Sequence, residues 1–159
     1  DRIVSVGMAE HLGKKFYKTY FKKINDLLKD DGLGLVHTIG SIDRPQPPAP
    51  FIQKYIFPGG IVPCLSDLIT PIEKTGLVVN DIETLIRHYD KTLESWLARF
   101  MDKKQEVKDL FDERFVRCWE FYLASCAAAF KYRDLVVFQL QLVKNFDAIP
   151  SNRRDYIYS

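Results

Sequence analysis

A carboxylate and an imidazole stand side by side near the start of the chain. Glu10 and His11 follow the apolar stretch 3–6 and lie between two glycines, Gly7 and Gly13. Such a pair at the end of a buried strand can hold or transfer a proton at a bound molecule. The alternative is structural, because polar side chains in a loop before a helix also satisfy free backbone amides. The pair by itself decides neither role.

Two further polar side chains occur where later elements begin or end. His37 closes a second apolar segment, and Tyr89 opens an amphipathic one. A carboxylate, an imidazole and a phenol could together bind a small anion and support acid–base chemistry. A histidine at a strand end is more often simply hydrogen-bonded, and Tyr89 also fits the apolar stripe of its own helix. A tyrosine can serve both purposes, with its ring in the core and its hydroxyl in a site.

Hydrophobic periodicity predicts the elements that position these side chains. Residues 2–8 and 33–39 are predicted to be buried strands, separated by a helix over 14–28. This βαβ order favours a parallel sheet. Ligands collect at the carboxyl ends of parallel strands, which is where Glu10 and His37 fall.

The second part of the chain predicts more helix than strand. Residues 41–50 contain four prolines and predict a long loop, of the kind that is usually functional or disordered. The tail over 151–159 either frays or packs through its aromatic residues. The other predicted elements are a helical turn over 51–57, helices over 65–74, 89–101 and 113–131, and strands over 77–85 and 135–143.

Composition limits the possible classes of protein. The chain has 159 residues, enough for one domain, and 47% of them are hydrophobic, so that a core can form. The net charge of +2 argues against a dedicated nucleic-acid-binding protein. No apolar run approaches the roughly 20 residues of a transmembrane helix. Cys64, Cys118 and Cys126 lack metal-ligand spacing, which predicts reduced thiols, a cytoplasmic setting and no metal site.

Five segments carry a family resemblance. They are DRIVSVGMAEHLG, LVHTIGS, KYIFPGGIVP, HYDKTLESW and ERFVRCWEFYLASCAAAFKYRDLVVFQLQL, in this order. Together they resemble the C-terminal part of the cyclopropane-fatty-acyl-phospholipid synthases and the related mycolic acid cyclopropane synthases. The resemblance extends from Asp1 to about Tyr156. It implies an α/β, Rossmann-like class I methyltransferase fold, with residues 1–159 forming the C-terminal part of a single catalytic domain.

The resemblance also implies an activity. The family transfers a methylene group from S-adenosylmethionine to a cis double bond of phospholipid acyl chains, with bound bicarbonate as the base. The resemblance implies that this chain is cytoplasmic, has no transmembrane segment and acts at the inner face of the membrane. An alkene is a weak nucleophile and its attack leaves positive charge on the acyl chain, which aromatic faces can stabilise. A small anion held close by can then remove the proton.

The resemblance assigns roles to individual residues. It implies that Glu10, His37 and Tyr89 are catalytic and bind bicarbonate, with Ile39 contacting the anion through its backbone. The residues implied to line the S-adenosylmethionine site are Val6, Gly7 and His11. Cys126 matches a cysteine that has been considered an active-site residue. Its small neighbours, and the absence of a basic one in sequence, favour a structural role, so that it is only a candidate.

Two groups of side chains have both a functional and an ordinary interpretation. The lysines of 14–23 could attract anionic phospholipid headgroups, although the solvated face of a helix is the favoured interpretation. Several aromatic residues could line an acyl-chain channel, with core packing as an equal or better explanation. They are Trp96, Phe100, Trp119, Phe121, Tyr122 and Phe130.

The sequence departs from the family by what it lacks. The Gly-rich cofactor loop and the acidic ribose ligand of the family's first half are absent, and Gly32-Leu33-Gly34 precedes a strand instead of following one. We therefore expect this chain to be inactive by itself. We also expect the strand at 2–8 to offer an unpaired edge, to a homodimer partner or to the missing N-terminal half. A related small-molecule or lipid methyltransferase and a non-catalytic remnant remain the alternatives.

Overall fold

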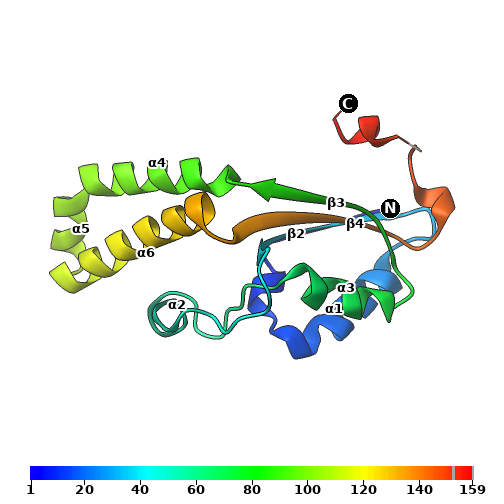
Figure 1. The fold of residues 1–159 in the computed structure, drawn as a ribbon, viewed down its shortest axis with the longest axis horizontal. Helices are drawn as coiled ribbons and strands as arrows, with labels where there is room; N and C mark the ends of the chain where they lie inside the picture. Colours follow the sequence, from blue (N-terminus) through cyan, green and yellow to red (C-terminus); the bar gives the residue numbers. More distant parts are fainter. Residues whose placement is uncertain (152, 159) are drawn as a thin grey trace.

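A four-stranded sheet organises the computed structural model, which describes residues 1–151 and 153–158 (Figure 1). The strands are β1 (Arg2–Val6), β2 (Leu33–Ser41), β3 (Val78–Ile86) and β4 (Leu135–Val143). They lie in the order β1-β2-β4-β3. β1 and β2 are parallel, whereas β4 runs antiparallel to both β2 and β3.

The direction of β4 corrects the expectation of a parallel sheet, which is right only for β1 and β2. The chain leaves β3 through a pair of packed helices and returns to the same end of the sheet, so that β4 must run back against β3. Because β4 opposes both neighbours, β3 runs in the same direction as β1 and β2. The carboxyl ends of these three strands therefore meet at one edge.

The helices are α1 (Tyr17–Leu27), α2 (Pro50–Tyr55), α3 (Leu65–Glu73), α4 (His88–Asp102), α5 (Lys104–Leu110) and α6 (Glu113–Tyr132). Short 3₁₀ turns are η1 (Ala9–His11), η2 (Lys14–Phe16), η3 (Phe146–Ala148) and η4 (Arg154–Ile157). The predicted helices and strands are present with shifts of a few residues at their ends. α5 was not predicted, because its sequence shows no apolar stripe.

The main core lies between the sheet and two helices. α1 and α3 lie side by side against one face of the sheet (Figure 1). Their apolar sides meet the sheet at fully buried residues such as Phe21, Leu68 and Leu140. This layer fixes the strand ends that carry the polar side chains.

The helices α4, α5 and α6 form what we call the helical arm, residues 88–132. The arm extends beyond the strand ends and away from α1 and α3 (Figure 1). α4 and α6 pack along each other through Leu93, Leu123 and Phe130, and this second core reaches the sheet at Val137. The Asp112 side chain caps α6 by accepting a hydrogen bond from the Phe115 N–H at 2.6 Å.

The outer strand β1 has one neighbour within the described part of the chain. Val4 and Val6 lie on its uncovered face and are 66% and 64% exposed. On the same sheet the tail packs and does not fray, because the Asn80 amide donates to the Tyr156 hydroxyl at 2.8 Å. The predicted tail also includes Asn152 and Ser159, which lie outside the described residues. No helix in the described ranges is long and apolar enough to cross a bilayer.

Candidate functional site

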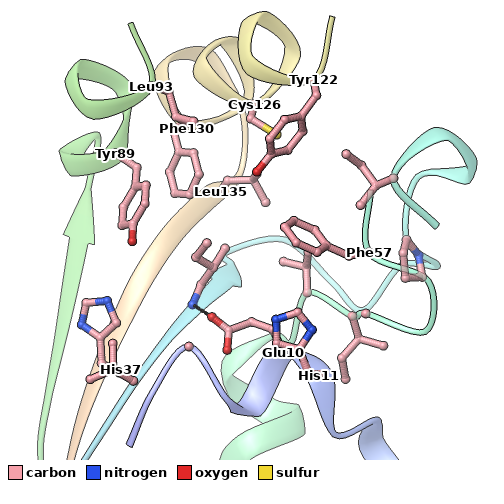
Figure 2. A pocket seen from close by; sticks show the side chains of 18 of the residues that line it. Glu10, His11, His37, Phe57, Tyr89, Leu93, Tyr122, Cys126, Phe130 and Leu135 are labelled. Carbon is pink, nitrogen blue, oxygen red and sulfur yellow. Dashed lines mark hydrogen bonds between the residues drawn. The ribbon is translucent and has the colours of Figure 1, made fainter. Parts of the chain in front are cut away.

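An apolar cavity of about 260 Å³ lies at the edge where β1, β2 and β3 end (Figure 2). Its walls come from these strand ends, from the helical arm and from a segment between β2 and α3 that we call the strap, residues 48–62. Most of its lining is apolar, and its polar groups gather at the strand-end side. Glu10, His37 and Tyr89 all line it. Three separate segments thus bring their polar side chains to one cavity, as the sequence predicted.

Glu10 is the most informative of these side chains. One carboxylate oxygen, Oε1, accepts a hydrogen bond from the Ile39 backbone N–H at 2.6 Å. The other, Oε2, is buried and has no hydrogen-bond partner among the described residues. A buried carboxylate oxygen without a donor is costly in free energy, so that such atoms normally have a partner. The geometry of Glu10 therefore calls for a donor on a bound molecule.

The backbone around Glu10 is held from three sides. The buried Tyr17 hydroxyl donates to the Ala9 carbonyl at 3.1 Å, and burial raises the pKa of this phenol. The Glu10 carbonyl accepts from the Ile61 N–H of the strap at 2.8 Å. The Gly7 N–H donates to the His37 carbonyl at 3.0 Å, which joins the end of β1 to the middle of β2. These contacts fix η1 and with it the position of the carboxylate.

His37 and Tyr89 face the cavity from opposite elements. His37 lies in the middle of β2 and not at its end as expected, because β2 continues to Ser41; it faces the cavity because β1 ends opposite it, at Val6. The Tyr89 hydroxyl points down toward the His37 ring from the first turn of α4 (Figure 2). The Tyr89 ring stacks on Phe130 with centroids 5.2 Å apart. This stacking holds the ring in the second core while its hydroxyl reaches the cavity, so that Tyr89 fits both of the interpretations given above.

The residues implied for the cofactor line the same cavity. Val6, Gly7 and His11 lie at its strand-end side, and the His11 ring meets Phe57 edge-on at 5.6 Å. Gly7 has a positive φ of 63°, which a glycine adopts without strain, and open space surrounds the position a Cβ would take. Ile39 also lines the cavity. Its backbone N–H, the implied anion contact, is engaged here by Glu10.

Cys126 lines the cavity from α6 (Figure 2). Burial raises the pKa of its thiol to about 11, so that the thiol is protonated at neutral pH. A protonated thiol is a poor nucleophile. Cys126 thus forms part of the cavity wall and shows no feature of a reactive cysteine.

The aromatic residues divide into three groups, and Phe121 alone forms one of them, exposed and packed against Phe51. Trp96, Tyr122 and Phe130 line the cavity. Phe100 and Trp119 pack inside the helical arm, as ordinary core residues do. Burial, followed by the charges of Cys126 and Tyr89, raises the pKa of Tyr122 to about 12 and keeps its hydroxyl neutral.

Sequence analysis missed the strap as a wall of the cavity. Ile52 and Phe57 line it, together with residues 60–62. The signal was present in the segment KYIFPGGIVP, which contributed to the family resemblance but was given no residue roles. The Leu93 and Leu135 side chains were also missed as lining residues, because apolar residues in regular elements look like core.

Other candidate groups are absent or paired in the described part of the chain. No set of three or more His, Cys, Asp or Glu side chains there is arranged to hold a metal ion. Among the lysines of 14–23, Lys14 pairs with Asp67 at 2.8 Å and Lys22 with Asp26 at 3.1 Å. Both pairs agree with a solvated helix face.

Comparison with known proteins places this arrangement in a family. The family model described as "Mycolic acid cyclopropane synthetase" matches residues 1–140. The chain belongs to this cyclopropane synthase family. It is 42% identical over 140 residues to the cyclopropane-fatty-acyl-phospholipid synthase of Escherichia coli K12, which covers 88% of this chain and 36% of that protein. The chain thus spans about a third of that curated relative.

A second relative and a solved structure extend this result. A probable fatty acid methyltransferase of Pseudomonas putida is 36% identical over 151 residues, which cover 92% of this chain and 38% of that protein. The mycolic acid cyclopropane synthase CmaA1, complexed with SAH and CTAB, superposes with a TM-score of 0.81 and 32% identity, over 89% of this chain and 54% of that chain. The likeness confirms the predicted Rossmann-like class I methyltransferase fold, present here in part.

Proposed function

We propose that this chain forms the lipid-acceptor side of an S-adenosylmethionine-dependent enzyme that converts cis double bonds of phospholipid acyl chains into cyclopropanes at the cytoplasmic face of the membrane. The observation that carries the proposal is Glu10 Oε2, buried without a donor among the described residues, at the polar end of an otherwise apolar cavity. The apolar walls suit an acyl chain. The unsatisfied oxygen suits a small hydrogen-bonding ligand beside it.

The strand-end side of the cavity suits the cofactor. S-adenosylmethionine, when bound, supplies an electrophilic methyl group on a positively charged sulfur. Val6, Gly7 and His11 would hold that end of the molecule, since Gly7 leaves space and the Glu10 carboxylate provides negative charge nearby. A companion segment or a second copy would pair with β1, where Val4 and Val6 are exposed, and complete the cofactor site.

The three polar side chains suit a small anion that also carries an O–H. Bicarbonate, when bound, supplies a base for the proton that leaves the transferred carbon. Glu10 Oε2 would accept a hydrogen bond from its O–H, while the Tyr89 hydroxyl and the His37 imidazole would donate to its other oxygens. The stacked rings of Tyr89 and Phe130 present aromatic surface to positive charge that develops on the acyl chain.

The test is Glu10→Gln in the complete enzyme that carries this chain. The amide keeps the size of the side chain and removes the charged acceptor, so that we expect turnover to fall by about a hundredfold or more. The matched control is Glu83→Gln on β3, outside the cavity, which we expect to retain the parent turnover. Mass spectrometry of the acyl chains measures the product. Parent-like turnover of Glu10→Gln would contradict the proposal.

A methyltransferase that adds a methyl group without closing a ring is the second candidate. The observation that favours it is the 36% identity to a probable fatty acid methyltransferase. The same assay separates the two, because a methyl-branched or methylene product differs from a cyclopropane in its fragmentation. A folded complete protein that makes neither product would indicate the non-catalytic remnant.

A further inference from the structure

Another hollow lies outside the cavity, lined by residues of α2 and of the first half of α6. It has a volume of about 230 Å³. Its floor is aromatic, with Phe51 packed edge-on against Phe121 at 4.7 Å. Tyr55, Arg114 and Arg117 also line it. We call it the outer cleft.

Cations converge on the outer cleft from both helices. Lys54 of α2 lies over the Tyr55 ring at 5.1 Å. Hydrogen bonding and charge from Lys54, followed by those from Arg114, lower the pKa of the Tyr55 hydroxyl. Cations from two different elements therefore act on this phenol. Arg117 lies one helical turn beyond Arg114, on the same face of α6.

These cations form no ion pair within the described residues, unlike several lysines of the helical arm. On the helical arm, Lys103, Lys104 and Lys108 form ion pairs with Glu106, Glu120 and Glu113, each at 2.7 or 2.8 Å. Within the described residues, by contrast, no carboxylate forms an ion pair with Lys54, Arg114 or Arg117. The outer cleft thus carries cations that no ion pair in the described part of the chain neutralises, with Glu113 as a carboxylate whose charge acts on Arg117.

The same end of the arm exposes apolar side chains. Leu110 and Phe111 precede α6 and are 77% and 62% exposed. Phe121 and Tyr55, in the outer cleft, are 56% and 46% exposed. Cationic and aromatic side chains together on one surface are typical of contact with the headgroup region of a membrane.

We propose that the outer cleft binds the phosphate of a phospholipid headgroup, whose acyl chain enters the neighbouring cavity. The proposal rests on the proposed function, because it supposes that the substrate is a lipid. Guanidinium groups match phosphate oxygens in paired hydrogen bonds, and Lys54 adds a point charge. The Tyr55 hydroxyl is a further donor in the cleft.

The spacing along α6 fits one lipid molecule. Arg117 faces the outer cleft and Cys126 faces the cavity. Cys126 lies nine positions beyond Arg117, about 14 Å along the axis of α6 and half a turn around it. This is comparable to the extended length from a phosphate, through its glycerol ester, to a mid-chain double bond, so that the lipid would pass around the side of α6. Phe57 and Tyr122, with ring centroids 6.1 Å apart, join the strap to α6 along the same route.

The experiment compares two double variants of the complete protein that carries this chain. Arg114→Gln with Arg117→Gln removes the charge of the outer cleft. Lys91→Gln with Arg99→Gln removes the same charge from exposed positions of α4 outside the cleft. Binding is measured by co-sedimentation with vesicles of fully saturated phosphatidylglycerol and phosphatidylcholine. These lipids have no double bond, so that binding is read without turnover. Titration calorimetry with inorganic phosphate forms the second arm.

We expect the cleft variant to bind vesicles about tenfold more weakly than the parent, and the control to stay near the parent. Equal loss in both variants would overturn the proposal in favour of general charge attraction, and no loss in either would overturn it outright. Inorganic phosphate that binds the parent, is lost in the cleft variant and leaves vesicle binding unchanged would assign the cleft to free phosphate instead. If the complete enzyme makes no lipid product while vesicle binding still depends on the cleft, the proposed function fails and the headgroup site stands.

Discussion

The sheet with its two packed helices and the helical arm differ in how they use apolar residues. In the first region, Leu140 and Phe21 are fully enclosed. The arm buries a single seam between α4 and α6 and leaves Trp96, Leu110 and Phe121 exposed at 43%, 77% and 56%. The sheet layer supplies two of the polar side chains of the site, and the arm and the strap together supply most of its apolar wall. The densely packed region thus positions polar side chains of the site, and the sparsely packed arm exposes apolar side chains that could contact lipid.

The largest expected effect is on the free energy of unfolding, which should fall strongly for a substitution in the sheet layer and little for one in the helical arm. Leu140→Ala empties a fully buried position, and we expect it to lower the free energy of unfolding by about 3 kcal/mol. Leu110→Ala, at an exposed position of the arm, should change it by no more than about 0.5 kcal/mol. Denaturant titration of the two variants measures the difference. Similar losses in both would show that the arm packs against something at its tip.

The next effect concerns turnover. His37→Gln in the inner strand β2 and Tyr89→Phe at the base of the arm remove donors proposed to act as the proton leaves. We expect each to lower kcat by about a hundredfold in the complete enzyme, with cofactor affinity little changed. Trp96→Leu, in the apolar wall, should instead raise the KM for lipid at nearly constant kcat. Weakened cofactor binding with normal turnover in either polar variant would contradict the assignment.

The smallest effect is expected at Cys126. Cys126→Ser in the complete enzyme should retain turnover close to that of the parent, because a buried neutral thiol offers no reactive group. Burial raises the pKa of the thiol from 9.0 to about 11, and burial thus favours its protonated form. The contribution of this thiol to stability therefore falls as the pH rises from 9 through 11. The rate of alkylation by iodoacetamide should keep rising up to pH 11. Full alkylation at pH 8 would indicate an exposed, reactive cysteine.

The sequence predicted those helices and strands in which buried side chains recur at a regular spacing. β4 was predicted with the bounds that the structure has, because a run of apolar residues at 135–143 suits a strand covered on both faces. α5 escaped prediction because Lys104–Leu110 is short and mostly polar. The direction of β4 could not be predicted from local pattern, since it depends on where the helical arm returns the chain.

The candidate site was predictable to the extent that it follows strand ends. Glu10 follows β1, His37 lies in β2 and Tyr89 follows β3, and these strands run in the same direction. Their carboxyl ends therefore coincide, as in other α/β sheets. The strap was not predictable in the same way, because residues 48–62 have no hydrophobic period. The bond between the Ile39 N–H and the Glu10 carboxylate joins residues 29 positions apart and needs the register of β1 on β2.

Glu10 also binds the strap through its backbone, and this affects how the results of a mutational scan should be interpreted. Its carbonyl accepts from the Ile61 N–H, while its carboxylate accepts from the Ile39 N–H. A substitution that loosens the strap would therefore move the carboxylate without touching it. Positions near Ile61 would score as catalytic in an activity screen although they contact no reacting atom. Their signature would be that the loss of turnover follows the mobility of the strap and not the chemistry of the substituted side chain.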